Sequence, residues 1–205
     1  MESRNIRKYF LVLMVCALGI SGCSMETLSK TTDDETIAAK TKQHVTVITK
    51  STNSSYWKAV YAGAGAAATE YNLDLSLVGP AVEEDYETQN EMIYNAISNG
   101  TDAIVFSAID FQENAEAVNE AIKAGVDVVV IDSDVNSDEV SCRISTDNYE
   151  AGRTAGKTAL ANEAPELKIG IVNFDATTEN GQSREKGFRD EVTGDERVTI
   201  VDHIN

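Results

Sequence analysis

The segment HVTVITKSTNSSYWKAVYAGAGAAATEY, residues 44–71, decides the fold of this chain. Its first part, 44–48, is rich in β-branched residues and predicts a short strand. Its last part, 58–71, is rich in alanine and predicts a helix. Because a polar loop, 49–57, joins the two, the segment has the pattern that opens a β-α-β unit. In open α/β sheets such loops gather beyond the carboxyl ends of the strands, where ligands bind.

The loop carries two adjacent aromatic residues, Tyr56 and Trp57, and Trp57 is the only tryptophan of the chain. Short hydroxyl side chains, including Ser54, and one amide surround them. An aromatic face for stacking, with small polar groups at its edge, suits a neutral hydroxylated ligand. Ser54 could instead cap the helix, and the aromatic residues could be core packing at its start. Since two adjacent residues cannot both face one core, we expect at least one of them to face a cleft.

Strand and helix patterns alternate along the rest of the chain. Strands are predicted at 72–78, 103–106, 126–132, 140–145, 167–173 and 198–201, and helices at 86–98, 110–124, 147–163 and 183–192. Asp110 and Asp147 each begin a capping-box pattern, so both are expected to cap the helix that follows. The alanines and glycines of the first helix predict a close approach to the sheet. These glycines lie inside the helix and lack the spacing of a dinucleotide-binding loop.

Composition narrows the function classes. The 205 residues are 42% hydrophobic, enough for one large or two small domains, and the formal net charge of −17 argues against nucleic acid as a partner. No cofactor motif is present. The carboxylates after 131 have a pattern that a Mg²⁺-dependent enzyme could use, namely Asp132, Asp134, Asp138 and Glu139. Without a P-loop or a histidine in a catalytic setting, we expect no enzyme.

The N-terminus has the pattern of an export signal. Residues 1–22 contain basic residues, then a short apolar run, then Ile20-Ser21-Gly22 before Cys23, which resembles the lipobox of bacterial lipoproteins. We expect lipidation of Cys23 and a flexible tether over 23–43; the alternative is a plain secretory signal that contains a cysteine. Cys142 would remain as the only thiol, and its alternation with apolar neighbours predicts a buried structural cysteine.

Five motifs stand in the order and spacing of one known family. They are SSYW (54–57), AIVFS (103–107), VVID (129–132), STDNY (145–149) and QSREKGF (182–188). On these motifs the chain resembles the type I periplasmic-binding-protein family, in its branch of ribose-binding-protein-like sugar receptors of ABC importers. The resemblance implies a two-lobed α/β fold with parallel sheets flanked by helices. The first lobe is expected at 44–148, and a crossing helix with the start of an incomplete second lobe at 149–205.

The resemblance also implies roles for individual residues. Tyr56 or Trp57 would stack on a sugar ring, Asp132 would accept hydrogen bonds from ring hydroxyls, and Arg184 would donate from the opposite lobe. Ser107 is a further expected contact. Two alternatives follow from the residues themselves: Asp132 could cap the next turn, and Arg184 could be a surface charge.

Ser54 and Asp147 are expected ligand contacts that compete with capping roles. Ser133 follows Asp132 where ribose-type receptors often carry an arginine. The family implies a lipid-anchored, extracytoplasmic receptor that binds a small sugar-like molecule and delivers it to an ABC permease. The alternative is a sensor of the same fold that signals to a membrane kinase or chemoreceptor.

Overall fold

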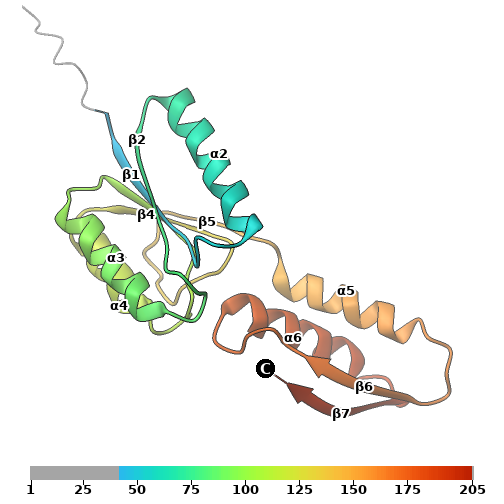
Figure 1. The fold of residues 1–205 in the computed structure, drawn as a ribbon. Helices are drawn as coiled ribbons and strands as arrows, with labels where there is room; N and C mark the ends of the chain where they lie inside the picture. Colours follow the sequence, from blue (N-terminus) through green and yellow to red (C-terminus); the bar gives the residue numbers. More distant parts are fainter. Residues whose placement is uncertain (1–41, 205) are drawn as a thin grey trace, which may run out of the picture. The chain divides into compact units, whose positions relative to one another are not determined.

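Five parallel strands form the larger of two sheets in the computed structural model, which describes residues 42–204 (Figure 1). In chain order the strands are β1 (His44–Ile48), β2 (Asp74–Val78), β3 (Ala103–Phe106), β4 (Asp127–Ile131) and β5 (Cys142–Ile144). Their order in the sheet is β2-β1-β3-β4-β5, and every pair is parallel. Ile48 lies opposite Phe106, and Phe106 lies opposite Val130. The strands therefore end together at one edge of the sheet.

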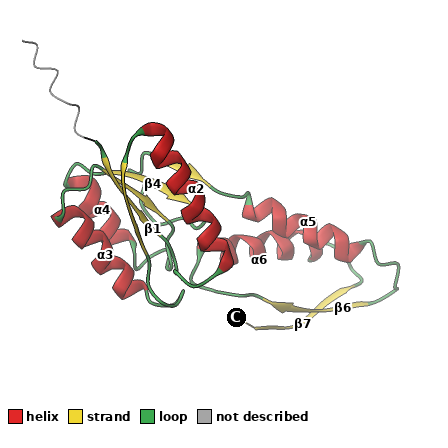
Figure 2. Cartoon of the chain, turned by 45° about the horizontal axis from the view of Figure 1, so that its top comes forward, coloured by secondary structure: helices red, strands yellow, loops and turns green. Residues whose placement is uncertain are grey.

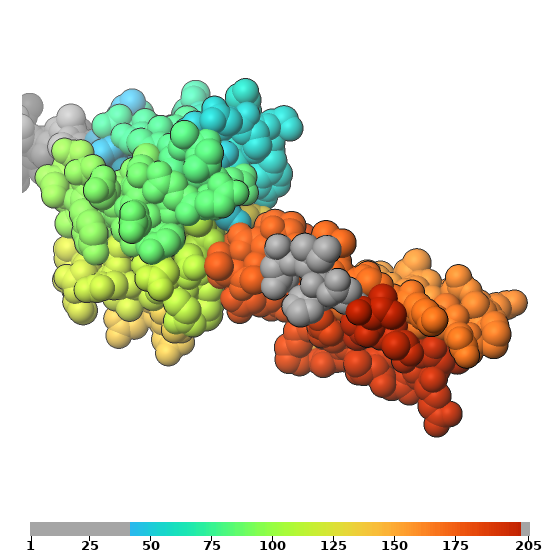
Figure 3. All heavy atoms as spheres, turned by 60° about the horizontal axis from the view of Figure 1, so that its bottom comes forward, coloured from blue at the N-terminus to red at the C-terminus, as the bar shows by residue number. Residues whose placement is uncertain are grey.

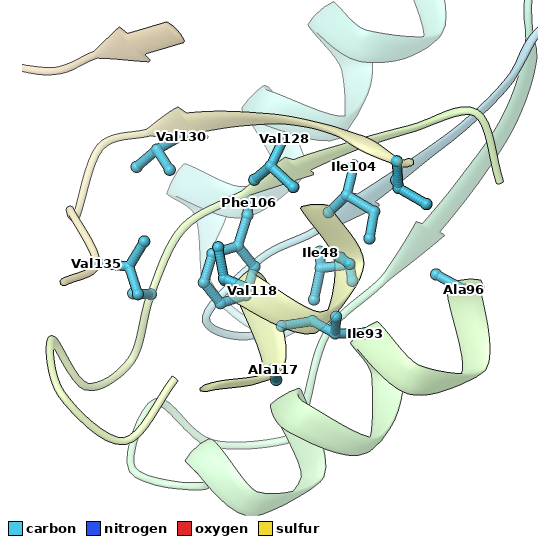
Figure 4. Close-up of a cluster of buried hydrophobic side chains, with 13 residues drawn as sticks. Ile48, Ile93, Ala96, Ile104, Phe106, Ala117, Val118, Val128, Val130 and Val135 are labelled. Atoms are coloured by element: carbon cyan, nitrogen blue, oxygen red, sulfur yellow. The ribbon is translucent and has the colours of Figure 1, made fainter. Parts of the chain in front are cut away.

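Helices α3 (Tyr86–Ser98) and α4 (Ala115–Lys123) cover one face of this sheet. Figure 4 shows the core side chains of the strands directed toward Ile93 of α3 and Val118 of α4; they are Ile48, Ile104, Phe106, Val128 and Val130. These side chains are 2% exposed or less. The apolar alternation of the strands thus makes the core, and its burial holds the carboxyl ends of the strands in place.

Helix α2 (Ser55–Tyr71) lies on the other face (Figure 2). Only Trp57 and Ala68 of this helix are buried. A side-chain carbon added at Gly63 or Gly65 would meet no atom within 4 Å. The expectation that small residues bring this helix close to the sheet is therefore wrong at the two glycines.

A second group of elements follows along the chain, coloured orange to red in Figure 3. It contains α5 (Asn148–Leu160), β6 (Leu167–Val172), α6 (Glu179–Val192) and β7 (Val198–Ile204). Strands β6 and β7 pair in parallel as a two-stranded sheet. The backbones of α5 and α6 approach closely, since a side-chain carbon at Gly152 would lie 2.0 Å from the carbonyl oxygen of Arg184. Glycine is needed there because no larger residue fits.

The α/β class, the parallel pairing and the flanking helices predicted from the sequence are confirmed. The second sheet has two strands within the described residues, where the first has five. The predicted signal peptide, Cys23 and most of the tether lie outside the described residues. Within 42–204 no helix combines the length and apolar character needed to cross a membrane.

Three local predictions are corrected. Cys142 is exposed rather than buried, because β5 is an outer strand paired only with β4 and all three of its residues are exposed. Asp110 does not cap α4, which begins at Ala115; its carboxylate accepts the N–H groups of Gln112 and Glu113 in the turn before the helix. The last helix begins four residues earlier than predicted, because the hydroxyl of Thr178 caps it.

Candidate functional site

Asp132 is the centre of a polar cluster at the carboxyl edge of the five-stranded sheet. It directly follows β4, and its carboxylate accepts hydrogen bonds from the hydroxyls of Tyr56 and Ser107 at 3.4 and 3.3 Å. The amide of Asn180 also donates to it at 3.4 Å. All three contacts are at the long end of the hydrogen-bonding range, so they hold the carboxylate weakly. Its oxygens can therefore accept shorter hydrogen bonds from a ligand.

The backbone at Asp132 has an unusual conformation. Its φ of 59° lies in the left-handed region, which few residues other than glycine adopt. Aspartate tolerates this region better than most side chains. Such strained residues cluster at functional sites, because the surrounding structure must hold them in place. At Asp132 this conformation turns the chain at the end of β4. The alternative expected from the sequence, that Asp132 caps a turn, concerned the same position.

The two adjacent aromatic residues separate, as expected for neighbours at a helix start. Trp57 is 2% exposed and its ring N–H donates to Glu83 at 2.8 Å, whereas Tyr56 is 54% exposed. The rings make an edge-on contact with their centroids 4.8 Å apart. Partial burial, and then the charge of Asp132, raise the pKa of Tyr56 above its ordinary value. The Tyr56 hydroxyl therefore stays protonated and donates its hydrogen to Asp132. The buried Trp57 ring packs against the Tyr56 ring.

Ser54 and Asp147 both cap helices. The hydroxyl of Ser54 accepts the N–H of Trp57 at 3.2 Å and begins α2. The carboxylate of Asp147 accepts the N–H of Glu150 at 2.9 Å and begins α5. These contacts satisfy N–H groups that a helix leaves unpaired at its start. The structure thus places both residues in the capping roles that competed with ligand contact.

Arg184 joins the cluster through two asparagines. Its guanidinium donates to the side-chain oxygen of Asn148 at 2.8 Å, and the amide of Asn148 donates to Asn180 at 3.3 Å. Asn180 then donates to Asp132. A continuous polar chain therefore connects the two charged residues that the sequence singled out. Asn148 lies inside one of the quoted motifs, whereas no local pattern distinguished Asn180.

Gln89 ties two strand ends together beneath the site, and sequence reasoning missed it. Its amide group is fully buried in α3 and donates to the carbonyl oxygens of Thr49 and Ser107 at 3.1 and 2.8 Å. Its oxygen accepts the N–H of Ile109 at 3.1 Å. These three hydrogen bonds of Gln89 thus hold the residues that follow β1 and β3. A buried glutamine on an otherwise apolar helix face was the available signal.

Lys50 was also missed, although it lies in the loop with which the sequence was opened. It follows β1 by two residues and is 3% exposed. Its ammonium lies 5.8 Å from the centre of the Phe174 ring. A hollow of about 320 Å³ adjoins this region and is lined by Glu83, Glu84, Tyr86, Ile109, Asp110 and residues 174–177. This volume is at the lower end for small-molecule sites, which run from about 300 Å³ upward.

The acidic run after β4 does not gather into a metal site. Both carboxylate oxygens of Asp134 accept hydrogen bonds from the guanidinium of Arg143, at 2.8 and 2.9 Å. Across 42–204, no three histidine, cysteine or acidic side chains are placed to hold a metal ion. The arrangement offers hydrogen bonds and an aromatic face, which are the means of binding a polyhydroxylated molecule.

Similarity to known proteins agrees with this arrangement. A family model described as a periplasmic binding protein domain matches residues 45–205. A curated D-ribose/D-allose-binding protein of Pseudomonas aeruginosa is 24% identical over an alignment of 157 residues, which covers 73% of this chain and 49% of that protein. The chain spans about half the length of the curated relatives it matches.

Two solved structures are also similar. A carbohydrate transporter solute-binding protein of Agrobacterium radiobacter, in complex with D-arabinose, is 28% identical with a TM-score of 0.75, over 80% of this chain and 58% of that chain. An ABC transporter solute-binding protein of Agrobacterium vitis with bound D-fucose is 31% identical with a TM-score of 0.72, over 77% and 56%. The family model covers far more than half of the sequence, and the chain therefore belongs to the type I periplasmic-binding-protein family.

Proposed function

We propose that this chain is the ligand-binding part of an extracytoplasmic solute receptor, which takes up a monosaccharide or a similar hydroxylated molecule between two hinged lobes. The receptor then delivers its ligand to an ABC import permease and carries out no reaction itself. The observation that carries this proposal is the weakly held carboxylate of Asp132 at the carboxyl edge of the sheet, beside the exposed ring of Tyr56. Both face the position where open α/β sheets bind ligands.

In this proposal Asp132 accepts hydrogen bonds from two sugar hydroxyls. Hydrogen bonds to a charged group contribute about 1.5–3 kcal/mol each, so this residue contributes much of the affinity. Tyr56 offers its ring face, and Arg184 donates to other ligand oxygens. The buried hydroxyl of Ser107 acts indirectly, by donating to the carboxylate of Asp132. Closing the lobes on the sugar would replace the long contacts within the cluster by shorter contacts to the ligand.

Ser54, Trp57 and Asp147 support the site in this proposal. Ser54 and Trp57 set the start of α2, from which Tyr56 projects. Asp147 begins α5 one residue before Asn148, the partner of Arg184. Changing any of the three would alter affinity by displacing a neighbour.

The N-terminal part completes the proposal. Residues 1–22 would be a signal peptide, Cys23 would carry lipid and 23–43 would tether the receptor to the cell membrane. The first lobe would span 44–148, and the crossing helix and start of the second lobe 149–205. Replacing Cys23 by serine should release the protein from the membrane fraction and abolish labelling by a fatty acid. Unchanged labelling would contradict the lipid anchor.

Calorimetric titration of the full-length protein with a panel of aldoses tests the binding function. We expect one of them to bind, and Asp132→Asn to weaken it by at least about tenfold, which is about 1.4 kcal/mol. Asp127→Asn is a matched control, because Asp127 begins the same strand at the opposite edge of the sheet. If both variants bind as tightly as the parent, Asp132 is not the ligand carboxylate.

A further inference from the structure

Lys50 is the buried lysine of the described chain. Its side chain is 3% exposed, whereas the other lysines without an ion pair, such as Lys58, Lys157 and Lys168, are exposed. Lysine is almost never buried to this degree unless a counter-charge pairs with it, because removing the ammonium from water is costly. The position of Lys50 therefore requires an explanation.

No counter-charge accompanies it within residues 42–204. The Lys50 ammonium makes no hydrogen bond and no ion pair there, and its recorded contact is the Phe174 ring at 5.8 Å. A cation over an aromatic ring contributes only about 0.5–1 kcal/mol at an exposed site, and Phe174 is exposed. The ring alone is a weak partner for a buried charge.

The ammonium is nevertheless reachable. Among the described residues, Ser133 Oγ is the polar side-chain atom that is both fully enclosed and without a hydrogen-bond partner. The ammonium of Lys50 has no hydrogen-bond partner among them either, so it is not fully enclosed. The small exposed area of Lys50 therefore includes its charged end. A molecule that enters the site from solvent can therefore touch it.

The sheet places this cation at the same edge as the candidate ligand carboxylate without joining the two. Lys50 and Asp132 follow β1 and β4, which flank β3, and all three strands end at the same edge. No carboxylate oxygen of Asp132 lies within 4.0 Å of the Lys50 ammonium, since no such ion pair occurs. A ligand lying across this edge thus meets an acceptor of hydroxyl protons at one end and an unpaired positive charge at the other.

We propose that the preferred ligand is an acidic monosaccharide, a uronic or aldonic acid, whose carboxylate pairs with Lys50 while its hydroxyls donate to Asp132. This inference rests on the proposed function and names its substrate class. One carboxylate on the ligand matches the one ammonium of Lys50. A phosphate group would bring a second negative charge close to Asp132 in a protein whose net charge is already −17. Pairing on ligand entry supplies the counter-charge that residues 42–204 do not provide.

Matched ligand pairs test the proposal in the full-length protein by calorimetry. The pairs are glucose with glucuronate, galactose with galacturonate, and ribose with ribonate; glucose 6-phosphate tests the phosphate alternative. We expect one acid to bind at least about tenfold more tightly than its neutral partner, and added salt to weaken the acid alone.

Substitutions locate the effect. Lys50→Met keeps the apolar stem and should reduce the acid-to-neutral affinity ratio to near one, whereas Lys50→Arg should keep a preference for the acid. Lys58→Met is the control, because Lys58 is exposed in the first turn of α2, and it should leave the ratio unchanged. If Lys50→Met does not fold, the ratio and its salt dependence in the parent protein and in Lys50→Arg decide the question.

Three outcomes would overturn the inference, each in a different way. If a neutral sugar binds as tightly as its acid, or more tightly, the charge assignment fails and the proposed sugar-binding function stands. If glucose 6-phosphate is preferred over every carboxylate, the charge argument holds but the acidic-sugar class is wrong. If no sugar of any kind binds, the proposed function fails and this inference fails with it.

Discussion

Replacing Gly152 by alanine tests how closely α5 and α6 pack. The added carbon would lie 2.0 Å from the carbonyl oxygen of Arg184 and 2.9 Å from the backbone nitrogen of Phe188. Non-bonded atoms do not approach within 3.0 Å of such a carbon, so the helices must separate by about 3.0 − 2.0 = 1.0 Å. No side-chain rotation relieves this contact, because both neighbours are backbone atoms.

The magnitude follows from two opposing terms. Inserting a methyl group into a packed interface costs about 1–3 kcal/mol, and a backbone contact places Gly152 at the upper end of that range. Alanine in a helix interior returns about 1 kcal/mol relative to glycine. We therefore expect a net loss of about 2 kcal/mol, or a fall in Tm of about 4–8 °C for a chain of this length.

Gly65 in α2 is a matched control. A side-chain carbon added there meets nothing within 4 Å, so Gly65→Ala should stabilise the protein by up to about 1 kcal/mol. Urea unfolding followed by far-ultraviolet circular dichroism measures both variants, and Trp57 fluorescence reports separately on the first lobe. The reasoning is refuted if Gly152→Ala is as stable as the parent, or if both substitutions shift stability in the same direction.

Three further predictions concern supporting residues. Gln89→Leu should destabilise the fold by about 2–4 kcal/mol in urea unfolding, because it leaves buried backbone groups unpaired. A loss below about 1 kcal/mol would contradict the role of Gln89 in holding the ends of β1 and β3. Asp147→Ala should cost about 1 kcal/mol and Asp147→Ser much less, since serine also caps helices; equal losses would argue against capping. Hydrogen bonds from Arg197 lower the pKa of Asp195 to about 2, so their stabilisation is complete above about pH 4 and is lost as pH falls through about 2. Asp195→Asn should thus be less stable than the parent at neutral pH and converge with it in acid; a constant gap would contradict this.

The sequence was sufficient for the elements and their class. Short apolar runs identified β3 and the buried strand β4, and capping residues located the start of α5, because these signals act between residues close in the chain. The same reasoning placed Asp132 at a strand end, where parallel topology brings ligand residues together. The resemblance of short motifs supplied Arg184 and the two-lobed architecture.

Local pattern failed where burial depends on distant partners. Alternation predicted a buried Cys142, but the thiol is exposed because β5 is an outer strand. Small residues predicted close packing of α2, whereas the close contact lies between α5 and α6, where Gly152 meets the backbone of Arg184.

Tertiary contacts also chose among roles that the sequence left open. Whether Tyr56 or Trp57 is exposed depends on Glu83, which lies 26 residues beyond Trp57 and binds its ring. The chain from Arg184 to Asp132 requires Asn180, which no local pattern distinguishes. That Lys50 has an aromatic ring but no polar partner among residues 42–204 likewise depends on every element packed around it. Periodicity reports which face a residue occupies, but the residue's partner there depends on which segments folding brings to the same place.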